Sequence, residues 1–183
     1  MNFLDRNEFN FEPSQKVIDA IKGFNPMDLC FYTRIYDEGK KSVITVRLSE
    51  MYNVPEEQVL LGYGGEDILK NAVHYYLTKG NNKTILIPEF SWWYYNSIAE
   101  EVEGQTEMYP LYEGDTFAYN VDEGIEYTNR ICPRMLLLAS PNNPTGNSLT
   151  SEEVGRIMEN IPAETMVLID QAYASFINSD VDY

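Results

Sequence analysis

Asp170 is the residue whose position most directly suggests chemistry. It follows the apolar residues 166–169, which read as a buried strand that ends at this carboxylate. A carboxylate that is partly removed from water must find a cation or several hydrogen-bond donors. A protonated ring nitrogen would suit it, and Tyr173 could present a phenol to the same ligand. The competing interpretation is a carboxylate that only caps the following turn.

A second polar segment follows another apolar run. Residues 135–139 are continuously apolar, as in a strand covered on both faces, and residues 140–146 read Ser-Pro-Asn-Asn-Pro-Thr-Gly. Pro144 fixes one backbone dihedral and removes a donor, and Gly146 permits an unusual backbone conformation. This rigidity could aim the Asn143 amide at a ligand. A rigid turn that simply ends a strand explains the same residues.

The third segment is a glycine-rich turn, Gly-Tyr-Gly-Gly at residues 62–65. Glycine lets the backbone approach a ligand closely, and the free amides at a helix start can hold a phosphate. This turn and the helix start after it are therefore a candidate anion-binding segment. A tight connection between a strand and a helix accounts for the turn equally well.

Alternating strands and helices are needed to bring these segments together. Apolar runs predict strands at 58–61, 84–87, 106–111, 135–139 and 166–169. Helical periodicity predicts helices from about Ser14, and over 42–52, 66–77, 91–101 and 150–160. Residues 114–130 read as a surface excursion with some helix. This order predicts an α/β fold, a three-layer α-β-α sandwich with a mostly parallel sheet, in which ligands bind beyond the carboxyl ends of the strands.

Composition narrows the classes of function. A formal net charge of -16 argues against nucleic acid or an anionic membrane as a partner. The sequence contains no apolar run long enough to span a membrane and no signal-peptide pattern, so we expect a cytoplasmic protein. Cys30 and Cys132 lack metal or redox spacing, and the single histidine, His74, falls in a helical pattern. We therefore expect neither a metal site nor a histidine-based triad.

Taken in order, the motifs resemble those of the fold-type I (class I/II) aminotransferases that use pyridoxal 5'-phosphate, most of all the histidinol-phosphate aminotransferase branch. The matching segments are residues 4–8, 34–36, 62–67, 88–91, 140–146 and 170–173. The fold class that the resemblance implies is a partial large domain of the aspartate aminotransferase type. Residues 1–40 would form an amino-terminal segment and residues 41–183 an incomplete cofactor-binding domain, without the carboxyl-terminal domain.

The resemblance implies a role for each matching residue near the cofactor ring. Asp170 would pair with the pyridine nitrogen, Asn143 and Tyr173 would bond the ring hydroxyl, and Phe90 would stack on the ring. Phe90 belongs to an aromatic run, residues 90–95, most of which we expect in the core or an interface.

At the other end of the cofactor, the backbone of Gly64, Gly65 and Glu66 would hold the phosphate. Tyr36 would reach the phosphate of the neighbouring subunit, which implies a homodimer. Gly65 and Gln171 depart from the residues usual in this branch. The first departure removes a possible side-chain contact with the phosphate.

The resemblance also implies a Schiff-base lysine roughly 30 positions after the aspartate. The seven lysines, from Lys16 to Lys83, all precede Asp170. No catalytic residue is therefore assigned, and we expect the 183-residue chain to be inactive alone. It could be a fragment of a longer enzyme, half of a split enzyme, or a non-catalytic descendant.

The function that follows from the resemblance is transfer of an amino group from an amino acid or amino-acid phosphate to a 2-oxo acid. Two alternatives stay open. Threonine-phosphate decarboxylases share the same motifs, and a binding or interaction module could retain a vestigial cofactor pocket.

Overall fold

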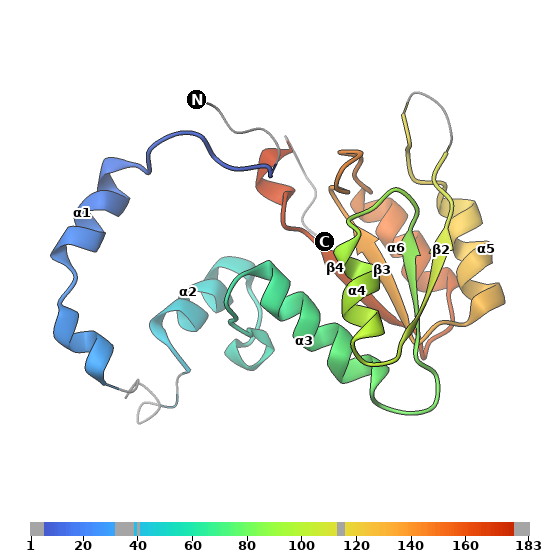
Figure 1. Cartoon of the computed structure of the whole chain (residues 1–183), viewed down its shortest axis with the longest axis horizontal. Coiled ribbons are helices and arrows are strands. Elements are labelled where there is room, and N and C mark those ends of the chain that lie inside the picture. Colours follow the sequence, from blue (N-terminus) through green and yellow to red (C-terminus); the bar gives the residue numbers. More distant parts are fainter. Residues whose placement is uncertain (1–5, 32–38, 40, 113–115, 178–183) are drawn as a thin grey trace. The chain divides into compact units, whose positions relative to one another are not determined.

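The computed structural model describes residues 6–31, 39, 41–112 and 116–177 (Figure 1). The chain divides into two compact units, Met1–Leu60 and Leu61–Tyr183. Tyr36, the residue expected to reach a neighbouring subunit, lies outside the described residues. In the described part of the chain, every helix is too short or too polar to cross a membrane.

The first unit is built from short helices with little buried surface. Its elements are α1 (Gln15–Gly23), the 3-10 turn η1 (Pro26–Cys30), α2 (Val43–Tyr52) and the 3-10 turn η3 (Glu56–Gln58). Ser14 precedes α1 as expected, but its side chain makes no capping bond. Thr45 is the buried residue of this unit's described part, at 2 % exposure.

A polar clamp joins α2 to the turn after it. The Lys41 Nζ donates to the carbonyls of Glu56, Glu57 and Val59 at 3.0, 3.2 and 3.2 Å. Thr45 Oγ1 donates to the Glu56 carboxylate at 2.5 Å. This hydrogen bond is the main reason why the pKa of Glu56 lies below its usual value.

The predicted strand at 58–61 is wrong. Gln58 ends the turn η3, and Leu60 and Leu61 are 71 % and 42 % exposed. A run of four apolar-rich residues cannot be assigned to a strand by pattern alone, and no strand in the described part of the chain pairs with it. The segment is a connection into the helix that follows.

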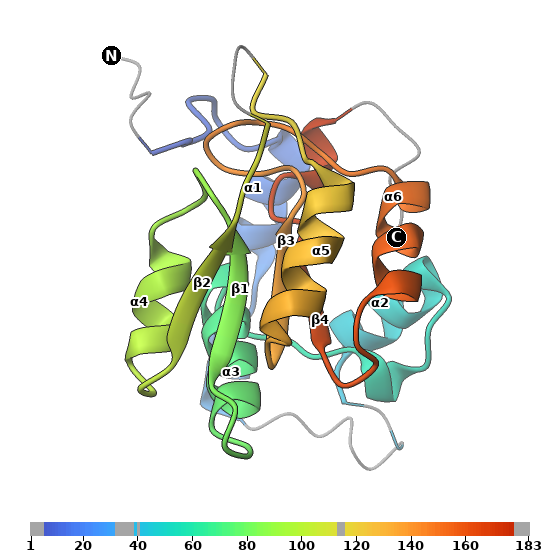
Figure 2. The same cartoon turned by 90° about the vertical axis from the view of Figure 1, so that its right-hand side faces the viewer.

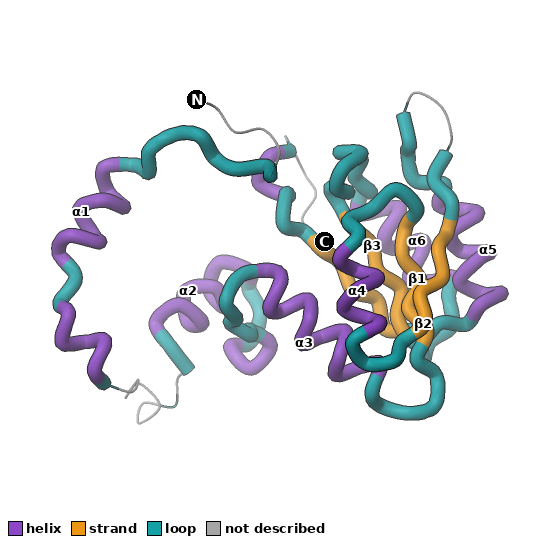
Figure 3. The backbone as a smooth tube through the Cα atoms, viewed as in Figure 1, coloured by secondary structure: helices purple, strands orange, loops and turns teal. Residues whose placement is uncertain are grey.

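The second unit contains a four-stranded parallel sheet, in the order β2-β1-β3-β4 (Figure 2). Figure 3 shows its strands in orange between helices. The strands are β1 (Thr84–Pro88), β2 (Gln105–Tyr109), β3 (Met135–Ala139) and β4 (Met166–Asp170). The four remaining strand predictions are therefore confirmed, with small differences at the ends. The predominantly apolar β3 lies in the interior of the sheet, as expected for a strand that is covered on both faces.

Helices cover both faces of this sheet (Figure 2). The helices α3 (Gly65–Leu77) and α4 (Tyr94–Glu100) pack on one face, and α5 (Val121–Ile131) and α6 (Ser151–Asn160) on the other. Along β3, side chains alternate between the two cores. Met135, Leu137 and Ala139 face α3 and α4, whereas Leu136 and Leu138 face α5 and α6. This confirms the three-layer α-β-α sandwich.

Two helices differ from the prediction. Helix α4 begins at Tyr94, three residues later than expected, because residues 91–93 lie outside the helix. Helix α5 occupies much of the polar interval 114–130, where Asn120 caps its first turn by accepting from the Glu123 amide. The capping box that opens α6 is confirmed, since Thr150 and Glu153 bond each other's backbone amides.

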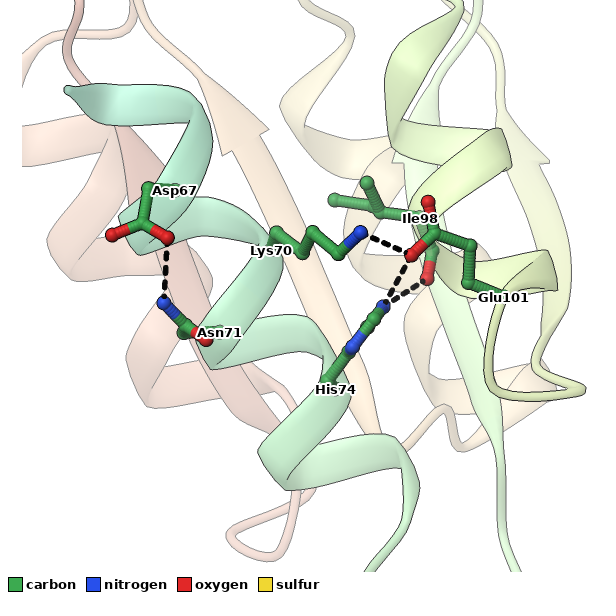
Figure 4. Close-up of polar contacts among 6 residues, drawn as sticks. All are labelled: Asp67, Lys70, Asn71, His74, Ile98 and Glu101. Atoms are coloured by element: carbon green, nitrogen blue, oxygen red, sulfur yellow. Dashed lines mark hydrogen bonds and ion pairs between the residues drawn. The ribbon is translucent and has the colours of Figure 1, made fainter. Parts of the chain in front are cut away.

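A polar cluster links α3 to α4 on their outer surface (Figure 4). Glu101 accepts from Lys70 Nζ at 2.5 Å and lies 3.3 Å from His74 Nε2. The same Nε2 lies 3.1 Å from the carbonyl of Ile98, so it faces two acceptors and carries a proton. His74 is thus a structural residue of the α3–α4 contact.

Candidate functional site

The polar segments that end β3 and β4 lie side by side. Ala139 pairs with Asp170 in the register of the two strands, and the Ser140 amide donates to the Asp170 carbonyl at 2.9 Å. The ladder therefore continues one residue past the end of β3. It places the loop of residues 140–146 next to the carboxylate that was predicted from a different part of the sequence.

Two donors hold the Asp170 carboxylate. The Tyr95 hydroxyl donates to Oδ2 at 2.8 Å, and the Ala172 amide donates to Oδ1 at 3.0 Å. Tyr95 is 2 % exposed. Burial, and after it the charge of Asp170, raises the pKa of Tyr95 far above its ordinary value, so the phenol keeps its proton and acts as the donor. Asp170 thus caps the following turn and also faces a buried phenol.

Sequence reasoning missed this role of Tyr95, which stood in an aromatic run assigned to core or interface. The two partners are 75 positions apart, and no local pattern connects them. The only available signal was that a desolvated carboxylate requires donors, without any indication of which residues supply them.

The loop after β3 is held by Asn142. This side chain is 2 % exposed, and its Nδ2 donates to the Phe90 carbonyl at 3.1 Å and to Thr145 Oγ1 at 2.9 Å. The Asn142 carbonyl accepts from the Gly146 amide at 2.7 Å, and Gly146 adopts a left-handed φ of 75°. The loop is therefore a rigid turn, as one of the two interpretations required.

The loop also presents a side chain that is not committed elsewhere. Asn143 is half-buried, and its amide forms no hydrogen bond within residues 6–31, 39, 41–112 and 116–177. The side-chain nitrogen of its neighbour Asn142, by contrast, donates two hydrogen bonds that hold the loop. The rigid-turn and ligand-aiming interpretations of this loop are therefore compatible, because different residues serve them.

Phe90 lies two residues after the end of β1 and is joined to the same loop through its carbonyl. Its backbone adopts the left-handed conformation, with φ at 50°, and its side chain is half-exposed. The ring meets Phe117 edge-on, with centroids 5.1 Å apart and an interplanar angle of 66°. The loop that carries Asn143 is thus bonded to a residue with a half-exposed aromatic ring.

Tyr173 lies in the turn after β4, just before the short 3-10 turn η4 (Ala174–Phe176). It is half-buried, and its interaction with Tyr95 adds to the raised pKa of that residue, after burial, Asp170 and Tyr119. The structure therefore brings Phe90, Asn143, Asp170 and Tyr173 to one edge of the sheet.

The start of α3 forms a separate part of the candidate site. No side chain caps this 13-residue helix, so its first backbone amides are open to an acceptor. Gly64 has a φ of 90°, and a Cβ added at Gly64 or Gly65 would meet nothing within 4 Å. Open amides and open space together suit an anion. No hydrogen bond connects Gly64 or Gly65 to the residues around Asp170 in the part of the chain that is described.

The carboxylates in the first turn of α3 are engaged with neighbours. Asp67 accepts from the Tyr63 amide at 3.0 Å and from Asn71. Glu66 lies beside Tyr94 of α4. Burial is the main cause that raises the pKa of Tyr94, and the Glu66 charge adds to it. This contact relates the start of α3 to α4, the helix that also carries Tyr95.

The sequence also matches a known protein family. Residues 3–183 match the family described as aminotransferase class I and II. The chain is 27% identical to histidinol-phosphate aminotransferase 2 of Oceanobacillus iheyensis, over 98% of this chain and 46% of that protein. The chain thus spans about half the length of the curated relatives it matches.

Two solved structures share the fold at low sequence identity. Histidinol-phosphate aminotransferase from Sinorhizobium meliloti, in complex with pyridoxal-5'-phosphate, has a TM-score of 0.80 and 19% identity, with 96% of this chain and 45% of that chain covered. L-threonine-O-3-phosphate decarboxylase from Porphyromonas gingivalis has a TM-score of 0.57 and 22% identity, with 76% and 40% covered. Since the family match extends over nearly all of the sequence, the chain belongs to the class I and II aminotransferases.

Proposed function

We propose that this chain supplies the ring-facing wall of a pyridoxal 5'-phosphate pocket in an enzyme that moves an amino group between an amino acid and a 2-oxo acid. The observation that carries the proposal is the Asp170 carboxylate, held by the buried Tyr95 phenol at 2.8 Å beside the loop that presents Asn143. Family membership supports the cofactor, because family members and a solved structure with pyridoxal-5'-phosphate share this fold.

The residues at the sheet edge fit this cofactor chemically. Each oxygen of a carboxylate has two lone pairs, so Asp170 retains acceptor capacity after bonding Tyr95 and Ala172. A protonated ring nitrogen is a donor that matches it. When bound, the cofactor supplies an electron sink for the reacting carbon of the substrate. Asp170 would hold the proton on the ring nitrogen, and Tyr95 would keep the carboxylate oriented.

The other site residues would complete the pocket. Asn143 and Tyr173 would bond the ring hydroxyl, and Phe90 would cover one face of the ring. The open amides of Gly64, Gly65 and Glu66 would hold the phosphate, aided by the partial positive charge at the start of α3. Tyr36 would extend to the phosphate of a neighbouring subunit, so a homodimer is part of the proposal, as is a cytoplasmic location.

This assignment concerns the groups of the chain that would tune the cofactor. The seven lysines precede Asp170 in the sequence, whereas the family resemblance implies a lysine after it. We propose that the 183 residues alone bind the cofactor only weakly and without a covalent bond, and do not turn over substrate. The amino-group donor, an amino acid or amino-acid phosphate, and the 2-oxo acid acceptor would belong to the whole enzyme.

Pyridoxamine 5'-phosphate is a suitable probe, because it needs no lysine to bind. Titration of the chain, followed by fluorescence or NMR, should give saturable binding that Asp170→Asn weakens at least tenfold, or about 1.4 kcal/mol. Asp19→Asn, on helix α1, is the matched control and should leave the affinity unchanged. A wild-type chain that does not bind the probe, or an Asp170→Asn variant that binds equally well, would disprove the assignment.

A second candidate reaction is decarboxylation of a threonine phosphate. The structural similarity to L-threonine-O-3-phosphate decarboxylase favours it, although at 22% identity that similarity concerns the fold alone. The two reactions would use the same residues of this chain. An enzyme that contains this chain together with a Schiff-base lysine would release carbon dioxide from threonine phosphate in one case and form a new amino acid from a 2-oxo acid in the other.

A further inference from the structure

The loop of residues 140–147 does more than present Asn143. It carries two side-chain amides, Asn142 and Asn147, that reach across to the connections after β1 and β2. Asn142 Nδ2 donates to the Phe90 carbonyl after β1. Asn147 Nδ2 donates to the carbonyls of Thr116 and Phe117, which lie after β2, the second at 3.0 Å.

The direction of these bonds is fixed by chemistry. A backbone carbonyl can only accept, so each amide must place its nitrogen, not its oxygen, toward the aromatic segment. The two amides are also connected, because the Asn142 backbone amide donates to the Asn147 carbonyl at 2.8 Å. One loop therefore ties together the carboxyl-end connections of β2, β1 and β3.

The segments that are held in this way carry an unusual pair of aromatic residues. Phe90 and Phe117 both have left-handed backbones, with φ at 50° and 47°, which is disfavoured for residues with a side chain. Their rings contact each other edge-on. Such backbone conformations persist only where the surroundings hold them, and the bonds from Asn142 and Asn147 act on these residues directly.

Only one end of the Asn142 side-chain amide is bonded. Its Oδ1 is buried and finds no donor within the described residues. A buried carbonyl oxygen without a partner costs folding free energy, which the bonds from Nδ2 to the Phe90 carbonyl and to Thr145 must offset. The amide is retained at a place where it controls the backbone of Phe90.

We infer that Asn142 is a positioning residue that sets the Phe90 ring as one face of the cofactor pocket, with Asn147 and Phe117 bracing that ring from its edge. This inference rests on the proposed function, because Phe90 has its role only if a cofactor ring lies against it. None of these three residues contacts the cofactor in this scheme; each of them acts through Phe90.

The test combines two measurements on the 183-residue chain. The first labels the eight phenylalanines with 4-fluorophenylalanine and follows the Phe90 signal, assigned with Phe90→Leu, by fluorine NMR without cofactor. Asn142→Asp removes the donor and should shift or broaden this signal. Asn129→Asp is the matched control. Asn129 Nδ2 also donates to two backbone carbonyls, those of Ile125 and Asn160, but it lies near the end of α5. The control should leave the Phe90 signal unchanged.

The second measurement is the affinity for pyridoxamine 5'-phosphate. Asn142→Asp should weaken it about tenfold in the wild-type background and have no further effect in the Phe90→Leu background, because the amide acts through that ring. Equal effects in both backgrounds, or an unchanged Phe90 signal, would overturn the inference. If Asn142→Asp does not fold, as judged by circular dichroism, Asn147→Ala provides the same test through Phe117.

The two proposals fail in different ways. A wild-type chain that does not bind the probe contradicts the proposed function and, with it, the role of Phe90 at a cofactor. Binding that depends on Asp170 but is indifferent to Asn142 contradicts the positioning role alone. Loss of affinity in Asn142→Asp that disappears in Phe90→Leu supports both.

Discussion

Different interactions stabilise the interior of each of the two compact units. In the second unit, both faces of the sheet carry apolar cores that include Leu137 and Leu138, each nearly inaccessible to solvent. In the first unit, the contacts are polar, centred on Lys41 and Glu56, and apolar residues such as Ile44 and Leu60 are exposed. Apolar burial is the larger source of stability, so the second unit is the rigid platform on which a site can be built.

Truncation of an apolar side chain should give the largest difference in stability between the two units. Leu137→Ala in β3 leaves a cavity in a closed core and should lower the free energy of unfolding by about 2–5 kcal/mol. Ile44→Ala on α2, where the side chain is 59 % exposed, should change it by less than about 0.5 kcal/mol. Urea denaturation of both variants measures this difference. Similar losses for the two would contradict the contrast between the units.

The bond between Tyr95 and Asp170 should have the next largest effect. Tyr95→Phe deprives the half-buried carboxylate of a donor and should cost about 1–3 kcal/mol of stability. Tyr52→Phe in the first unit, where the side chain is 63 % exposed, is the control and should be neutral. Thermal melts at neutral pH would show whether the two substitutions differ.

The same pair predicts a dependence on pH. The pKa of Tyr95 is raised in the folded chain, so its neutral form is favoured there. The resulting stability is complete below the unfolded pKa of about 10 and is lost as the pH rises above it, because only the unfolded phenol ionises. The range from about pH 9 to about pH 11 brackets the ordinary tyrosine pKa. Over this range, the wild type should therefore lose more stability than Tyr95→Phe. Parallel losses would contradict the assignment.

Substitution of a surface carboxylate should have the smallest effect on stability. One such carboxylate in each unit allows the two units to be compared. Lys70 lowers the pKa of Glu101 in the second unit, and the Thr45 hydroxyl lowers that of Glu56 in the first. A depressed carboxyl pKa stabilises the fold above the unfolded value of about 4.3, and this contribution is lost as the pH falls through the folded pKa. Glu101→Gln and Glu56→Gln should therefore each lower stability slightly at pH near 7 and not at pH near 3.

Hydrogen exchange would locate these two losses. Glu101→Gln should increase exchange in α3 and α4, whereas Glu56→Gln should increase it around α2 and η3. Exchange that increases in the opposite unit, or a loss of stability that persists at low pH, would show that the carboxylates act differently from their contacts here.

Much of the fold could be predicted from the sequence because its signals are local. Residues 135–139 and 166–169 are apolar runs of strand length, and the capping box at Thr150 marks a helix start. The prediction of a strand at 58–61 was wrong because a short apolar run contains no information on whether a partner strand is available. The helix α5 was underestimated because a polar surface obscured its few inward-facing residues.

The family resemblance and the candidate residues Asn143, Asp170 and Tyr173 could be found without a structure, because motif identity and spacing along one chain are sequence properties. The bond from Tyr95 to Asp170, and the bonds by which Asn142 and Asn147 hold Phe90 and Phe117, became visible only in the folded chain. These partners are separated by 30 to 75 positions. Their contacts exist because parallel pairing brings the carboxyl ends of β2, β1, β3 and β4 to one edge, where connections without ladder partners must be bonded by side chains.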